Sequence, residues 1–257
     1  MHLKLENQVA FVAGSSRGIG RAIATALLAE GANVVLTGRN EDNLEKTLAD
    51  LATPENHTRI LPIAGDFTDP AAIRSAYART LDHFGKLDHL IANLGTGSGT
   101  PGATPPADDW TRLFEQNFFA SVRLTEAALP HLRTTGGSIL YLSSIVAVEA
   151  TPAPLPYCAA KAALTNYAKN LSRHVAHEHI RVNTICPGNI LFSGGTWERH
   201  LSNNRTAVEA MLGTEVPQNR FGTPEEIASL AAFLCSPLAA FSTGGTYIMD
   251  GGQTRSI

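Results

Sequence analysis

A tyrosine and a lysine stand four residues apart in the segment YCAAK, residues 157–161. On a helix this spacing places Tyr157 and Lys161 on one face. A free tyrosine has a pKa of about 10 and is a weak acid–base catalyst at neutral pH. An ammonium group one turn away favours the phenolate and brings the phenol's pKa toward the working range. The pair therefore predicts proton transfer, although an ordinary surface helix can carry the same spacing.

A pair of serines, Ser143 and Ser144, follows the predicted strand Ser138–Leu142. In a parallel sheet, this places their hydroxyls at the edge where ligands bind. A hydroxyl there can hydrogen-bond a substrate carbonyl oxygen beside Tyr157. The alternative is a serine that only caps the end of the strand.

The segment GSSRGIG, residues 14–20, connects a predicted strand to a predicted helix. Its glycines permit a tight turn and the close approach of a phosphate to main-chain N–H groups at the start of a helix. The spacing is GxxxGxG and lacks the GK[ST] ending of a P-loop, which disfavours an NTPase. A glycine-rich turn without a ligand is the alternative, but its position after the first strand favours a nucleotide site.

The residues after the second predicted strand indicate whether the site binds NAD or NADP. An NAD site has an acidic residue there for the ribose hydroxyls, whereas this chain has Thr37, Gly38 and Arg39. A guanidinium suits a 2′-phosphate, and Arg17 in the glycine-rich turn offers a second cation. Both arginines can also be read as solvated surface residues. Together they favour NADP, with NAD as the less favoured cofactor.

The elements that must position these residues alternate between strand and helix along the chain. Strands are predicted at Val9–Ala13, Asn33–Thr37, Ile60–Ala64, Asp88–Leu94, Ser138–Leu142, Arg181–Ile185 and Thr246–Met249. Helices are predicted at Ile19–Glu30, Glu41–Leu51, Ala71–Phe84, Asp108–Leu132, Tyr157–His177 and Pro224–Leu234, with irregular helical pieces over Ser193–Gly213. Because the strands are apolar on both faces, helices must cover both sides of a parallel sheet. We therefore predict an α/β fold: one doubly wound Rossmann-type domain over residues 1–257, with a seven-stranded parallel sheet.

Composition excludes several other classes of protein. The 257 residues are 44% hydrophobic and 17% charged, unlike a disordered chain. A net charge of −3 without a basic stripe disfavours nucleic acid as a partner. No apolar run approaches the ~18 residues of a membrane helix, and no leader is evident. The three cysteines lack metal-ligand spacing. We expect a cytoplasmic protein without a metal or a membrane partner.

The sequence resembles the short-chain dehydrogenase/reductase family over essentially its whole length. The matching segments, in order, are GSSRGIG (14–20), Asp66 in GDFTD, IANLG (91–95), Asn117 in FEQNFF, LSS (142–144), YCAAK (157–161), RVNTICPG (181–188), RFGTPEEIA (220–228) and MDGG (249–252). The resemblance implies the same doubly wound fold and a general acid, Tyr157, in ketone reduction. It implies that Lys161 lowers the pKa of Tyr157 and holds the nicotinamide ribose, that Ser144 polarises the carbonyl, and that Asn117 holds a water.

The resemblance also implies a set of cofactor-binding positions. Asp66 is expected at the adenine, Asn93 and Gly95 at the adenosine ribose, and Pro187, Gly188 and Ile190 at the nicotinamide. The full predicted set is Gly14, Ser16, Arg17, Gly18, Ile19, Gly20, Arg39, Asp66, Phe67, Asn93, Gly95, Tyr157, Lys161, Pro187, Gly188 and Ile190.

Several positions depart from the family pattern. Ala13 replaces the usual Thr that braces the glycine-rich turn, and residues 92–95 read ANLG instead of Asn-Asn-Ala-Gly. Phe192 stands where a Thr usually contacts the carboxamide. These changes affect the fine geometry of the cofactor site and leave the proton donor untouched.

These residues predict an NADP(H)-dependent oxidoreductase that interconverts a carbonyl compound and an alcohol. One alternative is a 3-oxoacyl-carrier-protein reductase, although Glu178 stands where such enzymes usually have a basic residue. A non-catalytic NADP-binding regulatory protein is the alternative of another class. The substrate lid is expected at about 190–213, with Glu149 and Glu198 as polar contacts. Trp197 is either a substrate contact or a packing aromatic. The resemblance implies a homotetramer.

Overall fold

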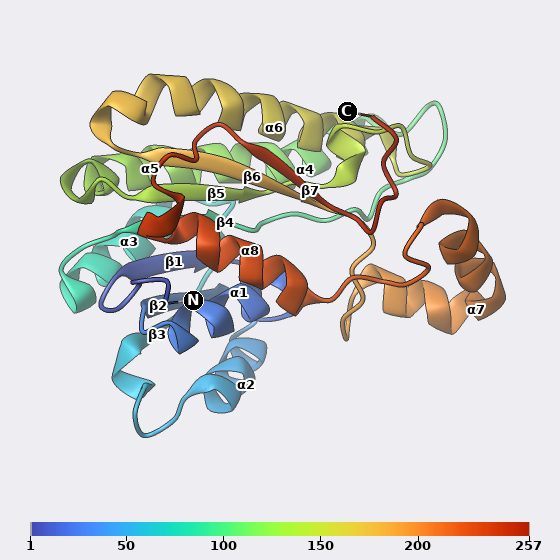
Figure 1. The fold of residues 1–257 in the computed structure, drawn as a ribbon. Helices are drawn as coiled ribbons and strands as arrows, with labels where there is room; N and C mark the ends of the chain where they lie inside the picture. Colours follow the sequence, from blue (N-terminus) through green and yellow to red (C-terminus); the bar gives the residue numbers. More distant parts are fainter. Residues whose placement is uncertain (1, 257) are drawn as a thin grey trace.

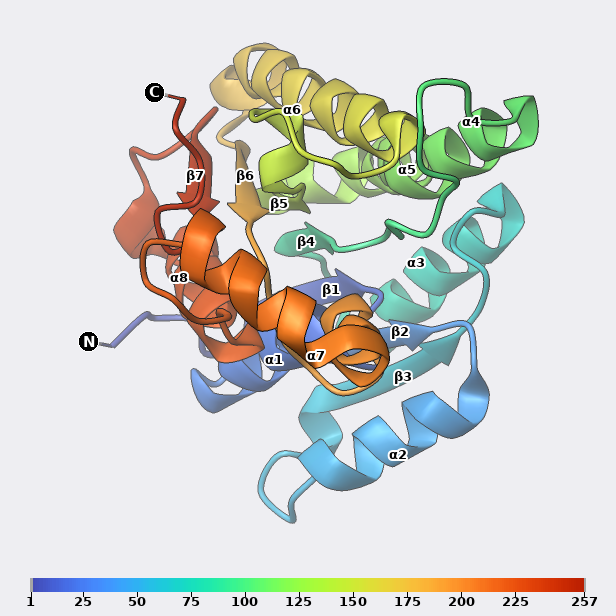
Figure 2. The same ribbon diagram turned by 90° about the vertical axis from the view of Figure 1, so that its right-hand side faces the viewer.

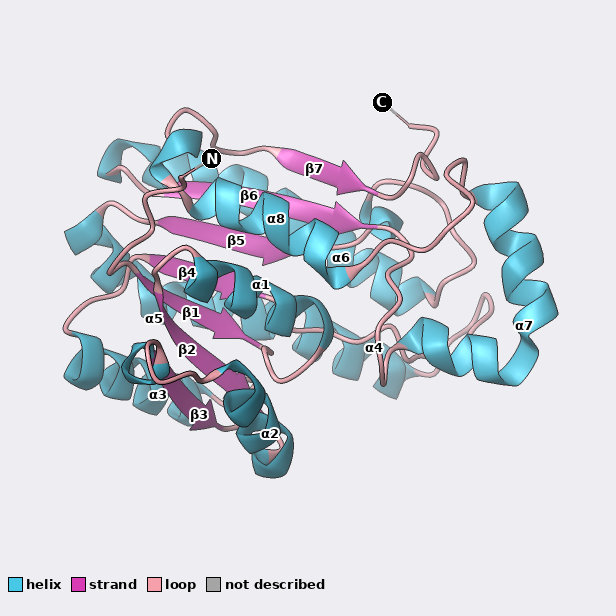
Figure 3. Cartoon of the chain, turned by 60° about the horizontal axis from the view of Figure 1, so that its bottom comes forward, coloured by secondary structure: helices cyan, strands magenta, loops and turns pink. Residues whose placement is uncertain are grey.

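The computed structural model describes residues 2–256 and contains one sheet of seven parallel strands (Figure 1). The strands are β1 (Val9–Ala13), β2 (Asn33–Gly38), β3 (Ile60–Ala64), β4 (His89–Ala92), β5 (Ser138–Leu142), β6 (Arg181–Pro187) and β7 (Thr246–Met249). Their order in the sheet is β3-β2-β1-β4-β5-β6-β7. The carboxyl ends of all the strands therefore meet at one edge, which faces α7 in Figure 3. The predicted fold class is confirmed.

Helices cover both faces of the sheet (Figure 2). They are α1 (Gly18–Ala29), α2 (Glu41–Leu51), α3 (Pro70–Phe84), α4 (Ala107–Phe114), α5 (Ala120–Thr135), α6 (Leu155–Val175), α7 (Thr196–Glu215) and α8 (Pro224–Cys235). Side chains of β1 alternate between two apolar cores: Val12 packs in the core that holds α1 and α8, and Phe11 in the core that holds α3, α5 and α6. Within residues 2–256, none of the helices has the length and apolar character that crossing a bilayer requires.

Two predicted elements differ from the structure for identifiable reasons. The strand predicted over 88–94 is limited to β4, because the Asn93 side chain turns to donate to the Gly14 carbonyl oxygen at 2.9 Å. The long helix predicted over 108–132 is divided into α4 and α5 by a π-helical turn, Glu115–Phe119. In this turn the N–H of Ala120 donates to the Glu115 carbonyl, five residues back.

The segment predicted to be irregular, 193–213, is more regular than expected. It forms α7, which is broken at Asn204, where φ is −157° and ψ is 80°. The Asn204 side chain accepts a hydrogen bond from the Ala207 N–H at 3.1 Å and caps the second half of the helix. Two helical pieces are therefore present, as expected, but they join into one kinked arm beyond the sheet edge (Figure 1).

Candidate active site

The turn between β1 and α1 offers unpaired main-chain donors. Gly14 and Gly18 have φ of +70° and +54°, which favour glycine, and a Cβ at Gly20 would overlap the Gly14 carbonyl oxygen. Arg17, the N-cap of α1, makes no side-chain capping hydrogen bond, and the first turn of the helix has no acidic residue. The first N–H groups of α1 therefore fit a phosphate, which the positive end of the helix also favours.

Two buried hydroxyls, which the sequence did not predict in this role, brace the turn. Thr37 Oγ1 accepts a hydrogen bond from the Gly14 N–H at 2.9 Å and donates to the Val12 carbonyl oxygen at 3.0 Å. Ser15 Oγ donates to the same carbonyl at 2.9 Å and accepts from the Thr37 N–H at 2.8 Å. These bonds supply the bracing that Ala13 lacks. The available signal was a hydroxyl residue at the carboxyl end of each of two adjacent strands.

The end of β2 brings the predicted adenine and 2′-phosphate residues near each other. Ser16 packs on Gly38, where an added Cβ would lie 3.0 Å from the Ser16 Cβ. Asp66 accepts hydrogen bonds from the N–H and the hydroxyl of Thr68, at 3.0 and 2.8 Å. The main-chain bond is the largest cause that lowers the pKa of Asp66, and the nearby Arg39 guanidinium adds to it. A cation and a carboxylate thus lie together at this edge.

Three other predicted cofactor residues have structural roles in the chain. The Phe67 side chain is buried and packs edge-on against Phe11, with 5.8 Å between ring centroids. Only its main chain remains for a cofactor. The Asn93 side chain holds the Gly14 carbonyl, so it supports the glycine-rich turn. Ile19 packs against the core that contains α1 and α8.

Tyr157 lies in the first turns of α6 and is partly buried. Burial raises the pKa of its phenol, and a hydrogen bond with Ser144 opposes part of that rise. Gly97 lies against the ring, since a Cβ there would be 3.7 Å from Tyr157 Cε1. Ser143 faces elsewhere, because its hydroxyl pairs with the Thr165 hydroxyl at 2.8 Å. Of the two predicted serines, Ser144 is therefore the one beside the tyrosine.

Lys161 is only 4% exposed, and burial lowers its pKa to about 8. Its ammonium group donates to the carbonyl oxygens of Leu142, at 2.8 Å, and Leu94, at 3.4 Å. Burial is the largest cause acting on the pKa of Tyr157, and the lowering of that pKa by Lys161 stays a prediction.

Asn117 lies in the π-helical turn and is fully buried. Its side chain donates to the Thr96 carbonyl at 3.0 Å and the Leu113 carbonyl at 2.9 Å, and it accepts from the Thr96 N–H at 3.1 Å. A Cβ at Gly95 would overlap Asn117 Oδ1 and lie 3.0 Å from Lys161 Nζ. The loop after β4 therefore packs tightly over both the asparagine and the lysine.

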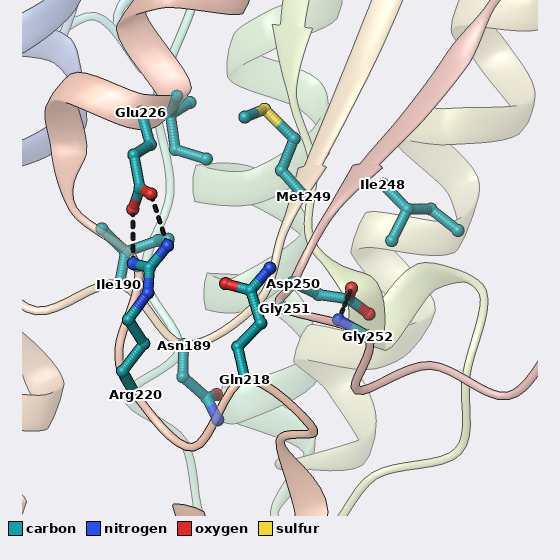
Figure 4. Close-up of a pocket in the computed structure, with 12 residues that line it drawn as sticks. Asn189, Ile190, Gln218, Arg220, Glu226, Ile248, Met249, Asp250, Gly251 and Gly252 are labelled. Carbon is teal, nitrogen blue, oxygen red and sulfur yellow. Dashed lines mark hydrogen bonds and ion pairs between the residues drawn. The ribbon is translucent and has the colours of Figure 1, made fainter.

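The segment after β6 passes from the sheet edge into α7. The Gly188 N–H donates to the Met249 carbonyl at 2.9 Å, and Ile190 pairs with Gly222 in an isolated bridge. A cavity of about 360 Å³ lies at this bridge (Figure 4). Its lining comprises Asn189, Ile190, Gln218, Arg220, Gly222, Glu226, Ile227, Ile248, Met249, Asp250, Gly251 and Gly252. It shares Ile190 with the predicted nicotinamide site, but Tyr157 is not part of its lining.

The two acidic side chains predicted to contact substrate are occupied by main-chain donors. Glu149 accepts from the N–H groups of Arg255 and Ser256, at 2.8 and 3.1 Å, and Glu198 accepts from the Gly194 N–H at 2.6 Å. Trp197 packs against Phe221, with 5.4 Å between ring centroids, which favours its reading as a packing aromatic. Among residues 2–256, no three His, Cys, Asp or Glu side chains are grouped to hold a metal ion.

The sequence of the whole chain matches a known protein family. The profile of the family described as Enoyl-(Acyl carrier protein) reductase matches residues 13–254. The chain is 34% identical over 252 residues to 3-oxoacyl-[acyl-carrier-protein] reductase FabG of Salmonella typhimurium, covering 98% of this chain and 99% of the relative. It is 32% identical over 255 residues to 2-(S)-hydroxypropyl-CoM dehydrogenase 3 of Xanthobacter autotrophicus, covering 99% of each.

Solved structures agree with the sequence comparisons. L-sorbose reductase from Gluconobacter frateurii, complexed with NADPH and L-sorbose, superposes with a TM-score of 0.92 at 33% identity, covering 100% of both chains. A 7α-hydroxysteroid dehydrogenase complexed with NADH and 7-oxo glycochenodeoxycholic acid superposes with a TM-score of 0.89 at 28% identity, covering 99% of this chain and 97% of the other. The relatives thus act on chemically different compounds.

Proposed function

Because the chain belongs to the short-chain dehydrogenase/reductase family of oxidoreductases, we propose that it is an NADP(H)-dependent enzyme that interconverts a carbonyl compound and an alcohol. The observation that carries the proposal is the convergence of Asn117, Ser144, Tyr157 and Lys161 at one sheet edge, next to a turn with free N–H donors. The NADPH in the L-sorbose reductase structure supports the choice of cofactor.

The residues around the glycine-rich turn fit a dinucleotide. The N–H groups at Gly18, Ile19 and Gly20 would hold the pyrophosphate. Arg39 would meet the 2′-phosphate through its guanidinium, and Asp66 would accept from the adenine amino group. Pro187, Gly188 and Ile190 would border the nicotinamide. When bound, NADPH supplies the hydride for the carbonyl carbon.

The chain's own residues then supply the proton and its orientation. The Tyr157 phenol donates its proton to the carbonyl oxygen of the substrate, and the Ser144 hydroxyl donates a hydrogen bond to the same oxygen. Lys161 would hold the nicotinamide ribose through its ammonium group, which lies beside Gly95. Asn117 holds the loop after β4 in place through Thr96 and would hold a water that links Lys161 to solvent.

The protonated phenol of Tyr157 is the form that donates to a carbonyl oxygen, and it is the form of a phenol near neutral pH. Alcohol oxidation needs the phenolate, so its rate should increase into the alkaline range.

A 3-oxoacyl-carrier-protein reductase is the second candidate, and the FabG relatives favour it. Carrier proteins are acidic, so their docking requires unpaired basic residues near the site. Here Arg133 Nε pairs with Glu178 Oε2 at 2.7 Å, and a second contact joins Arg133 Nη2 to Glu178 Oε1 at 3.2 Å. The pair lies just before β5 and β6, at the sheet edge opposite Tyr157, so the observation that supports a free small-molecule substrate is that Glu178 stands where a basic residue was expected.

One assay separates these functions from a non-catalytic role. The protein is mixed with NADPH and, in separate reactions, with sugars, steroids, simple ketones and 3-oxoacyl thioesters on a carrier or on a short thiol. A fall in NADPH absorbance with any free carbonyl compound supports the proposal. Turnover only with carrier-linked substrates would favour the second candidate, and NADPH binding without any turnover would favour the regulatory protein.

A further inference from the structure

The loop that connects β4 to α4 (Figure 2) passes beside Tyr157 at Gly97. A Cβ added at Gly97 would lie 3.7 Å from Cε1 and 3.8 Å from Cζ of Tyr157, which is ordinary van der Waals contact. Gly97 is exposed and has no side chain. The main chain of the loop therefore bounds the space next to the phenol, and the width of that space depends on where the loop runs.

Asn117 holds the start of this loop. Its side chain accepts from the Thr96 N–H at 3.1 Å and donates to the Thr96 carbonyl oxygen at 3.0 Å. The Thr96 hydroxyl in turn accepts a hydrogen bond from the Ser98 N–H at 3.1 Å. These contacts all run through Thr96, so the part of the loop that follows Gly97 needs partners of its own.

Two side chains of α4, Asp109 and Arg112, supply those partners. Asp109 Oδ2 accepts from the Thr100 N–H at 2.7 Å, and Arg112 Nη2 donates to the Ser98 carbonyl oxygen at 2.8 Å. The same Nη2 contacts Asp109 Oδ1 at 2.5 Å, so the two side chains form one ion pair, in which the Asp109 side chain is only 14% exposed. The Thr100 N–H, followed by Arg112, lowers the pKa of Asp109 to about 2. The carboxylate is therefore charged at neutral pH.

The stretch that this pair holds also packs in a narrow space at Gly99. A Cβ there would lie 2.8 Å from Leu113 Cδ1 and 3.1 Å from Pro154 Cβ. Leu113 is fully buried on α4, and Pro154 directly precedes α6, which contains Tyr157. Gly99 therefore lies between the helix that carries the ion pair and the start of the helix that carries the proton donor.

Beyond Thr100 the loop extends away from these contacts. Residues 101–104 are exposed, and a Cβ at Gly102 would meet no atom within 4 Å. The bonds from Asp109 and Arg112 are thus placed where the supported part of the loop ends.

We propose that Asp109 and Arg112 are positioning residues that hold the loop at Ser98 and Thr100 and thereby fix the wall that Gly97 presents to a substrate. The proposal rests on the proposed function, because the wall matters only to a substrate bound at Tyr157. The predicted cofactor residues of this segment, Asn93 and Gly95, precede Thr96 and lie on the other side of the Asn117 contact. Loss of the ion pair therefore weakens substrate binding and leaves cofactor binding unchanged.

The first test measures the steady-state reduction of a free carbonyl compound by NADPH. The probe is the free ketone, sugar or steroid of the panel above that the wild type reduces fastest. The variants are Asp109→Ala, Arg112→Ala and the double variant, with Asp108→Ala as the matched control. Asp108 is an exposed acidic residue in the same first turn of α4, so its variant reproduces the loss of a negative charge at the start of the helix.

Asp109→Ala should raise KM for the carbonyl compound by roughly tenfold, the lower end of the value of a hydrogen bond to a charged group. Its kcat and its dissociation constant for NADPH should stay near those of the wild type, as should all three values for Asp108→Ala. Arg112→Ala and the double variant should match Asp109→Ala, because the two side chains act as one unit. Asp109→Asn keeps an oxygen for the Thr100 N–H and should recover most of the loss.

Three results would overturn the proposal. The first is an unchanged KM in Asp109→Ala. The second is a loss of kcat and NADPH affinity together with the rise in KM, which would indicate a general structural role. The third is a double variant whose effect is the product of the two single effects, which would show that the side chains act separately.

A second measurement needs neither cofactor nor substrate. Amide hydrogen exchange of the cofactor-free protein is followed over residues 97–101, where Asp109→Ala should exchange roughly tenfold faster than Asp108→Ala. Unchanged exchange would overturn the positioning role even if the wild type reduces a carbonyl compound. Faster exchange in a protein whose wild type reduces no carbonyl compound would instead contradict the proposed function, and the role in substrate binding with it.

Discussion

His89, at the amino-terminal edge of the sheet, makes the fold sensitive to acid. The imidazole is 3% exposed and lies between Ser138 Oγ, 2.8 Å from Nδ1, and Gln8 Oε1, 2.5 Å from Nε2. A neutral ring satisfies both, donating to the amide oxygen and accepting from the hydroxyl. Burial is the main cause that lowers the pKa of His89 from 6.5 to about 4. Arg181 and Lys86 lower it further, and Asp88 opposes them.

The sign of the effect follows from this depressed pKa. Above pH 6.5 the ring is neutral in both the folded and the unfolded chain, so its contribution to stability is fully present. As the pH falls toward 4, the unfolded chain takes up the proton and the folded chain does not. Each pH unit in this window costs about 1.4 kcal/mol. The free energy of unfolding should therefore fall by about 2 kcal/mol between pH 7.5 and pH 5 through His89 alone.

Urea unfolding of the wild type and His89→Gln at the two pH values measures this contribution. Glutamine keeps a donor and an acceptor near Gln8 and Ser138 but does not titrate. The wild type should lose about 2 kcal/mol more than the variant between pH 7.5 and pH 5. Equal pH dependence in the two proteins would refute the reasoning, whatever the absolute stability of the variant.

Three further outcomes are expected. Arg39→Asp should weaken NADPH binding by about 10- to 150-fold, the value of one charge-assisted contact, and leave NADH binding unchanged or improved; an unchanged ratio of the two dissociation constants would make the arginine a solvated surface charge. Lys161→Ala should lower turnover and weaken NADPH binding together, as measured by steady-state rates and fluorescence titration; unchanged binding would remove the ribose role. Light scattering should give the homotetramer that the family resemblance implies, and the exposed apolar side chains of Phe119, Trp110 and Leu155 on α4–α6 and their connections are available for subunit contacts; a mass near 27.3 kDa would count against it.

The sheet was predictable because the apolar runs of the strands and the residues that start and end the helices agree along the sequence. Apolar runs such as Val9–Ala13 are buried on both faces, as a parallel strand must be. Asp69 and Pro70 predict the start of α3. The Asp69 carboxylate caps this helix by accepting a hydrogen bond from the Ala71 N–H at 2.9 Å. Apolar runs and capping residues act over a few neighbouring positions, so the sequence alone indicates them.

The features that the sequence did not predict depend on contacts between distant segments. The π-helical turn at Asn117 owes its place to Thr96, and the brace at Gly14 to Thr37. The main-chain partners of Glu149, Arg255 and Ser256, stand 106 and 107 residues further along the chain; the Glu198 bond to the Gly194 N–H is local and depends on the turn that precedes α7. The sequence therefore indicated the candidate catalytic residues, but it did not indicate the hydrogen-bond partners that position them.

The most direct test of the account is the turnover of Tyr157→Phe beside its affinity for NADPH. Phenylalanine keeps the ring against Gly97 and removes only the hydroxyl that donates the proton. Loss of a general acid typically costs about 10²- to 10⁴-fold in rate. We predict that carbonyl reduction by the variant falls below a few per cent of the wild-type rate while the dissociation constant for NADPH stays nearly unchanged. Reduction that persists at near the wild-type rate would contradict the assignment of Tyr157 as the proton donor.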